Sequence, residues 1–130
     1  MLAETLSINP ASVEWPKPWK PITNESDALA FGRQWNPQVS PTVLAELRRE
    51  TGPGHRLHGV DCQPLVSDGR KEFLFATDQP KSPVVLVHFT WHSETDPRWP
   101  ATVAYASLRE FLRKERQRTM KFWELWKLFR

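Results

Sequence analysis

The sequence predicts an α+β protein with a three- to four-stranded antiparallel sheet that is packed by two main helices in a single domain. Three observations support this fold class. Short runs rich in β-branched and aromatic residues lie between residues 58 and 105, and their connections are too short for crossover helices. One capped helical pattern precedes these runs and another follows them. A chain of 130 residues is also long enough to bury a core of its own.

Residues 1–22 are predicted to form an arm in front of the domain, which spans residues 23–130. The arm contains four Pro residues, and Trp15 and Trp19 lie among them. Pro removes backbone donors and disfavours helix at the preceding residue, so we expect an extended or polyproline-like segment. Two roles remain open. The two Trp rings lie on the domain surface, or the arm is a short linear motif for another protein.

Two helices are expected before the sheet. The first is a short helix over Asp27–Gln34, and the second covers Pro41–Thr51. Ser40 is a good N-cap for the second helix, Pro is favoured at the first helical position, and Gly52 follows the last turn. Its apolar residues form one stripe, which we expect to cover the sheet: Val43, Leu44 and Leu47.

Four strands are expected after these helices. Pro64 lies within the first of them and indicates an edge position or a bulge, because Pro cannot donate to a ladder. Asp68-Gly69 is a hairpin turn signal after this strand. The strands are expected over His58–Val66, Glu72–Thr77, Val84–Trp91 and Thr102–Tyr105.

The third run, which begins at Val84, has the strongest strand pattern in the chain. Side chains alternate between the faces of a strand, so one parity should be buried and the other should point away from the core. The residues expected in the core are Val85, Val87, Phe89 and Trp91, and those expected on the other side are His88, Thr90 and His92.

A basic, aromatic helix is expected at the C-terminus. Ser107 and Glu110 form a capping box at its start. The interval Arg113–Thr119 is polar throughout, so the segment is either one long helix or two. A second apolar cluster follows at helical spacing, and we expect packing within the chain or self-association through Phe122, Trp126 and Phe129.

The net charge of +3 is concentrated at the C-terminus. Residues 1–107 carry ten Lys and Arg against twelve Asp and Glu, whereas residues 108–130 carry eight against three. A basic helix with aromatic residues suits an acidic partner, a membrane surface or nucleic acid. Because no helix-turn-helix or RNA-binding signature accompanies it, nucleic acid and membrane are the less favoured partners.

The histidines suggest a metal site, but strand geometry argues against one. His88 and His92 are four residues apart, with Asp96 four further on. Along a strand, residues four apart are separated by roughly 13 Å, too far to share one ion. The glycines of Gly52-Pro-Gly54 also do not match a phosphate-binding loop. The sequence therefore predicts no metal and no cofactor.

No catalytic residue is assigned from the sequence. Cys62 lies near His58, but nothing in the pattern lowers the pKa of its thiol, and a structural cysteine is favoured. Glu94 and Asp96 are paired acids, and such acids in a polar loop more often form turns, with Arg98 to neutralise them. A lone cysteine and no signal-peptide pattern indicate the cytoplasm.

The loop after the third strand is the best candidate for recognition. It combines rigid aromatic residues, an Arg, a His and two acids, which are the groups that anchor binding. The candidate binding residues are Trp91, His92, Glu94, Asp96, Arg98 and Trp99.

Several motifs within residues 55–115 resemble a family of small bacterial proteins without an assigned activity. These motifs are a strand ending in His-x-Thr-Trp at residues 88–91, the Trp-Pro of residues 99–100, and a helix that starts at Ser107. The resemblance implies a compact α+β domain of bacterial, cytoplasmic origin, and it brings no activity.

The leading functional hypothesis is a non-enzymatic protein-binding module, of the kind that immunity or inhibitor proteins represent. The first alternative is a small hydrolase that uses His88 or His92 with a carboxylate of Asp61, Glu94 or Asp96. The second alternative is a nucleic-acid contact protein that uses the basic C-terminal helix.

Overall fold

The computed structural model describes the backbone of residues 8–128 and the side chains of residues 8–118. Short elements come first, then the helix and strands of the main fold, then one long helix. In chain order they are η1 (Pro10–Ser12), β1 (Lys20–Pro21), α2 (Glu25–Ala28), α3 (Ala30–Trp35), α4 (Val43–Glu50), β2 (Cys62–Ser67), β3 (Glu72–Thr77), β4 (Val84–His88), β5 (Ala101–Tyr105) and α5 (Leu108–Leu128).

The strands form one antiparallel sheet in the order β1-β2-β3-β4-β5, which confirms the α+β class and the antiparallel pairing. The expected number of three to four strands is wrong, because the sheet has five. The additional strand is β1, where Lys20 pairs with Ser67 and Pro21 with Val66. A strand of only two residues is too short to show an alternating pattern in the sequence. Pro21 is tolerated in β1 because β1 lies at the edge of the sheet.

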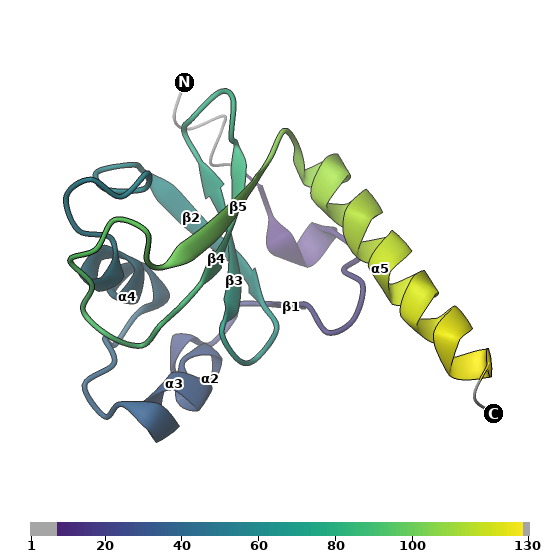
Figure 1. The fold of residues 1–130 in the computed structure, drawn as a ribbon, viewed down its shortest axis with the longest axis horizontal. Coiled ribbons are helices and arrows are strands. Elements are labelled where there is room, and N and C mark those ends of the chain that lie inside the picture. Colours follow the sequence, from purple (N-terminus) through teal and green to yellow (C-terminus); the bar gives the residue numbers. More distant parts are fainter. Residues whose placement is uncertain (1–7, 129–130) are drawn as a thin grey trace.

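The sheet separates two helical layers. Figure 1 shows α2, α3 and α4 on one face of the sheet and α5 on the other. The segment that contains η1 lies between the sheet and α5 (Figure 1). Because both faces are covered, β3 is buried almost throughout rather than on alternate residues.

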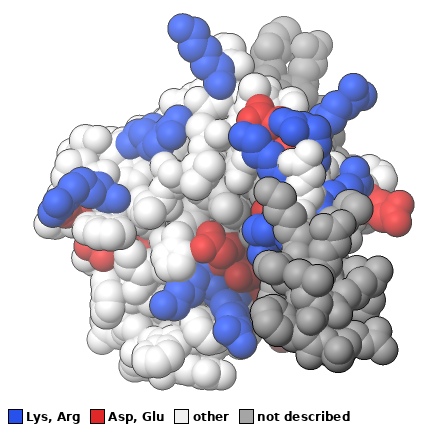
Figure 2. Space-filling model, turned by 45° about the vertical axis from the view of Figure 1, so that its right-hand side comes forward, with Lys and Arg blue, Asp and Glu red and all other residues white. Residues whose placement is uncertain are grey.

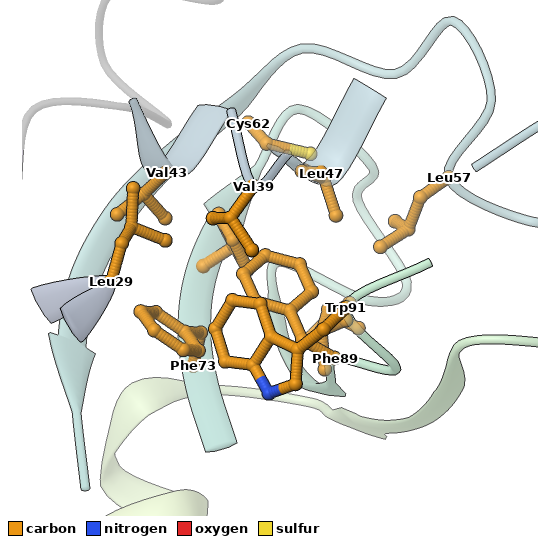
Figure 3. Close-up of a cluster of buried hydrophobic side chains, with 12 residues drawn as sticks. Leu29, Val39, Val43, Leu47, Leu57, Cys62, Phe73, Phe89 and Trp91 are labelled. Atoms are coloured by element: carbon orange, nitrogen blue, oxygen red, sulfur yellow. The ribbon is translucent and has the colours of Figure 1, made fainter. Parts of the chain in front are cut away.

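The core on the α4 side is built around aromatic rings. The Trp91 ring lies 5.3 Å from that of Phe89 and 5.9 Å from that of Phe73, in edge contacts. Figure 3 shows these rings together below Val39 and Leu47. All five side chains are buried, so this cluster joins α4 to the sheet and to the chain that follows β4.

The core on the α5 side includes the N-terminal segment. The rings of Trp19 and Phe111 are 5.4 Å apart, and Trp19 Nε1 donates a buried hydrogen bond to Glu115 Oε1 at 2.7 Å. Trp15 also contacts Phe111, with a ring separation of 6.4 Å. The residues ahead of β1 therefore fill the space between the sheet and the first turns of α5.

The helices before the sheet differ from their expected bounds. The expected helix over Asp27–Gln34 is two short helices, α2 and α3, which meet at Leu29. The next helix begins at Val43 rather than Pro41, because Thr42 is its N-cap and accepts from Ala45 N at 3.0 Å. Thr and Ser offer the same hydroxyl, so the pattern alone placed the cap two residues early.

Strand bounds are also shorter than expected at two places. The first main strand begins at Cys62 rather than His58, since residues 53–59 form turns. The strand that starts at Val84 ends at His88 rather than Trp91. The expected irregularity at Pro64 is confirmed, because the β2–β3 register shifts between Pro64 and Val66.

The predicted orientation of β4 and its continuation is confirmed. Val85, Val87, Phe89 and Trp91 are buried, whereas His88 and His92 are exposed. Thr90, which was expected on the same side as the histidines, is half-buried instead, and its hydroxyl donates to the buried Glu50. The alternation is therefore confirmed for the other residues and not for Thr90.

The C-terminal segment is one helix, α5, through the polar interval. Glu110 N donates to Ser107 Oγ at 3.0 Å, as the capping box requires. The carboxylate of Glu110 accepts from Ala106 N at 3.0 Å. The side chains of Phe122, Trp126 and Phe129, on which we based packing or self-association, lie outside the described residues.

Gly32→Ala should destabilise the protein by about 2 kcal/mol, because a Cβ at residue 32 would lie 2.3 Å from Trp91 Cε3. This clash should outweigh the gain of roughly 1 kcal/mol that Ala normally gives over Gly in a helix. Urea unfolding measures the effect, with the exposed Gln34→Ala in the same helix as control. A Gly32→Ala protein as stable as the wild type would contradict the packing of Trp91 on α3.

Candidate functional site

The chain turns sharply just after β4. Trp91 has a φ of 65°, in the left-handed region, and its side chain is only 2% exposed. A bulky residue in this conformation is strained and persists only where surrounding contacts hold it. The contacts at Trp91 therefore decide the path of the loop formed by residues 92–99, which we call the recognition loop.

The carboxyl group of Glu50 holds the chain before this loop. Its Oε1 accepts from Thr90 N at 2.7 Å and from Thr90 Oγ1 at 3.1 Å. Its Oε2 accepts from Trp91 N at 3.1 Å. Glu50 is the last residue of α4 and is fully buried, so these bonds tie the helix end to the end of β4.

Glu46 lies one turn earlier on α4 and is also fully buried. Burial raises the pKa of Glu50 to about 9, and the hydrogen bond and charge of Glu46 act in the same direction, against the donors of Thr90. Burial would also raise the pKa of Glu46, but hydrogen bonds with Glu50, Arg49 and Ser40 outweigh it and hold that pKa below its usual value. These opposite shifts favour a pair that holds one proton at neutral pH, on Glu50 rather than on Glu46.

Other residues fix the loop at both ends. Asn36 Nδ2 donates to Trp91 O at 2.8 Å. At the far end, Nε2 of the buried His55 bonds to Pro100 O at 2.9 Å. A Cβ on Gly52 would lie 3.0 Å from Glu94 O, so the loop backbone passes close to the chain that follows α4.

The middle of the recognition loop is exposed and has its own internal structure. Asp96 Oδ2 and Arg98 Nη2 form an ion pair at 2.7 Å, and Asp96 also accepts from Arg98 N at 2.9 Å. Hydrogen bonds from the Arg98 side chain hold the pKa of Asp96 below its usual value. Trp99 follows with 46% of its surface exposed, and His92 is exposed near the start of the loop.

The six candidate binding residues therefore divide into two groups. Trp91 lies in the core and supports the loop from below. Asp96 and Arg98 are brought together, Glu94 is half-buried, and His92 and Trp99 are exposed. The residues that hold the loop were not found from the sequence: Asn36, Glu46, Glu50 and His55.

The catalytic hypotheses find little support in the geometry. His88 Nδ1 forms a hydrogen bond with Glu72 Oε1 on the neighbouring strand β3, rather than with Asp61, Glu94 or Asp96. Burial raises the pKa of Cys62 to about 11, and its thiol contacts Val60 O at 3.5 Å, so it is a poor nucleophile. Among residues 8–118, no three His, Cys, Asp or Glu side chains are grouped as metal ligands.

Figure 2 shows Lys and Arg side chains spread over one face of the molecule. The described part of α5 carries basic side chains at Arg109, Arg113, Lys114, Arg116 and Arg118. Some are paired with acids on the same helix: Lys114 with Glu110 at 2.9 Å, and Arg118 with Glu115 at 2.8 Å. No helix in the described part of the chain has both the length and the apolar character that a membrane span requires.

No protein-family model, curated protein or solved structure matches this chain. The resemblance of residues 55–115 to a bacterial family therefore stays a prediction.

Glu50→Gln should remove a pH dependence of stability. The pKa of Glu50 is about 9 when folded and 4.5 ordinarily, so between these values the folded protein holds a proton that the unfolded chain has lost. The free energy of unfolding of the wild type should therefore fall as pH rises from 5 to 9, by at most about 1.4 kcal/mol per pH unit. The amide of Gln cannot titrate, so this slope should flatten.

Urea unfolding at a series of pH values measures the slope. The Gln side chain can still accept a hydrogen bond from Thr90 and donate one to Glu46, but it no longer offers an acceptor to Trp91 N. This loss should lower the free energy of unfolding by the same amount at every pH, so it does not change the slope. The exposed Glu14→Gln is the matched control and should keep the wild-type slope. Equal slopes in wild type and Glu50→Gln would show that Glu50 is not the protonated member of the pair.

Proposed function

We propose that this protein is a non-enzymatic binding module that recognises another protein through the recognition loop. One observation carries the proposal: polar contacts fix the chain at both ends of the loop, while Arg98 and the ring of Trp99 are exposed near its C-terminal end. Trp and Arg are the residue types most enriched among those that dominate the energy of protein interfaces. Here they are adjacent, as Arg98 and Trp99.

Pre-organisation supports a binding role for the loop. A flexible loop loses conformational entropy when binding orders it, and this loss weakens the affinity. A loop that is already fixed avoids the loss and binds more tightly for the same contacts. Glu50 and Asn36 hold the chain at Trp91, and His55 holds it at Pro100. The ion pair of Asp96 with Arg98 orders the exposed middle as well.

The exposed chemistry favours a protein partner over a small molecule. Small-molecule sites are concave, whereas the exposed loop residues stand on the surface. Two hollows of about 320 and 420 Å³ exist on the described surface, but the recognition loop lines neither of them. An exposed aromatic ring on a loop whose ends are fixed can enter a partner's cleft at little entropic cost, so we propose an inhibitor- or immunity-like role, in the cytoplasm.

The hydrolase alternative would rest on His88 and Glu72, which form the described His–carboxylate pair. Their side chains are 46% and 30% exposed on the sheet surface, and neither lines the two hollows. A nucleic-acid role would rest on α5, where two of the described basic side chains are already paired with acids. Both alternatives therefore rank below the binding module.

Trp99→Ala should weaken partner binding about thirtyfold or more, since loss of a central aromatic contact typically costs about 2 kcal/mol or more. The melting temperature should stay near that of the wild type, because the Trp99 ring is exposed. Immobilised full-length protein would capture the partner, and calorimetric titration would then compare the variants.

The matched control is Trp35→Ala, which removes an aromatic ring that is 69% exposed on α3, outside the loop. It should bind as the wild type does. A partner that binds Trp99→Ala as tightly as the wild type, or that is lost in Trp35→Ala instead, would contradict a contact surface on the recognition loop.

A further inference from the structure

One edge of the sheet is covered by another segment of the chain, and the other edge is not covered by any described segment. The edge at β2 is covered by the N-terminal segment: β1 pairs with it, Ile22 N donates to Leu65 O at 3.1 Å, and Gln63 Nε2 donates to Ile8 O at 2.8 Å. The other edge is β5, which pairs with β4 on one side only. Figure 1 shows β5 at the front of the sheet, with no other segment drawn over it.

The register identifies the backbone groups on this free edge. Phe89 N donates to Lys71 O, and Thr77 N donates to Pro83 O, so the odd residues of β4 bond to β3. The even residues of β4 must then bond to β5, opposite Ala101, Val103 and Tyr105. The N–H and C=O groups of Thr102 and Ala104 therefore point outward.

Side chains of the protein close this edge at both ends. His55 bonds to Pro100 O, and Glu110 accepts from Ala106 N. Within the described part of the chain, no hydrogen bond is formed to the outward groups of Thr102 or Ala104 between them. The N–H and C=O groups of Thr102 and Ala104 therefore form an open strand edge, which ends at Pro100 on one side and at Ala106 on the other.

We propose that β5 pairs with β5 of a second copy of this chain, antiparallel and about a two-fold axis at Val103. In this register Thr102 of each copy exchanges both backbone hydrogen bonds with Ala104 of the other. The open edge is thus complementary to itself. A two-fold axis at Thr102 would pair Ala104 with Pro100, which lacks an N–H group, and an axis at Ala104 would pair Thr102 with Ala106, whose N–H is taken.

Charge and side-chain character also favour a second copy. A two-fold axis brings each residue near its own equivalent, so a charged edge would repel itself. Natural proteins commonly protect free edges with Lys or other charges, yet Ala101–Tyr105 contains none. The charges at the strand ends are neutralised within each copy, Arg98 by Asp96 and Glu110 by Lys114. At the axis, Val103 is 52% exposed and would be covered by its equivalent.

The interface is small, so the dimer should be weak. A contact of four hydrogen bonds and one pair of Val side chains buries less surface area than a standard stable interface does. We therefore expect a dissociation constant roughly in the micromolar range. This association is separate from partner binding by the recognition loop and from any association through the aromatic residues beyond residue 118.

Sedimentation of the full chain from low micromolar to millimolar concentration tests the proposal, together with hydrogen exchange at both ends of that range. We expect a monomer–dimer equilibrium in which the amides of Thr102 and Ala104 become protected as concentration rises. Val103→Lys places like charges opposite each other and should raise the dissociation constant about tenfold or more. Gln34→Lys, an exposed position on α3, adds the same charge away from the edge and should leave it unchanged.

Two results would overturn the proposal. One is a wild-type chain that stays monomeric up to millimolar concentration. The other is a dimer in which the Thr102 and Ala104 amides exchange as fast as they do in the monomer, which would place the contact elsewhere, for example on the C-terminal part of α5. Because the exchange readout uses the wild type, it decides the question even if Val103→Lys folds poorly.

Discussion

The buried carboxyl group of Glu50 makes the connection on which the candidate site depends. It lies where α4 ends and β4 has stopped, and it accepts the amides of two consecutive residues, Thr90 and Trp91. Those bonds hold Trp91 in a left-handed conformation with its ring inside the core. A buried carboxylate alone would cost several kcal/mol in desolvation, so the proton on Glu50 and the ion pair of Glu46 with Arg49 are part of the same arrangement.

This arrangement explains how the recognition loop, in the described part of the protein, is held in one conformation at the surface. The aromatic core beneath the recognition loop fixes Trp91, and the polar contacts of Asn36 and His55 fix the ends of the loop. On the other side of the sheet, the N-terminal Trp residues fill the space beneath α5. Apolar packing thus occupies both faces of the sheet. The two surfaces that we propose for association, the recognition loop and the free edge of β5, lie on the described part of the protein.

The fold class could be predicted from the sequence because it depends on local patterns. Alternation in β4, the turn at Asp68-Gly69 and the capping box at Ser107 each act within a few residues. The fifth strand could not, because β1 is defined only by its partner Ser67-Val66, about 45 residues away. For the site, the exposed residues of the loop were recognisable by type, but their supports were not. Glu46 and Glu50 follow Val43 at helical spacing, on the face of α4 that Val43 and Leu47 bury, but acidic residues are rarely buried, so their type predicts exposure.

Hydrogen exchange at the amides of Thr90 and Trp91 tests most directly whether the carboxyl group of Glu50 anchors the recognition loop. If the buried carboxyl group of Glu50 holds them, both amides should exchange only through global unfolding, with the same free energy as the amides of β3. The Thr95 amide, in the exposed part of the loop, provides the fast reference. If Thr90 and Trp91 exchanged as fast as Thr95, the loop would not be anchored by Glu50, and the account of a pre-organised recognition loop would be contradicted.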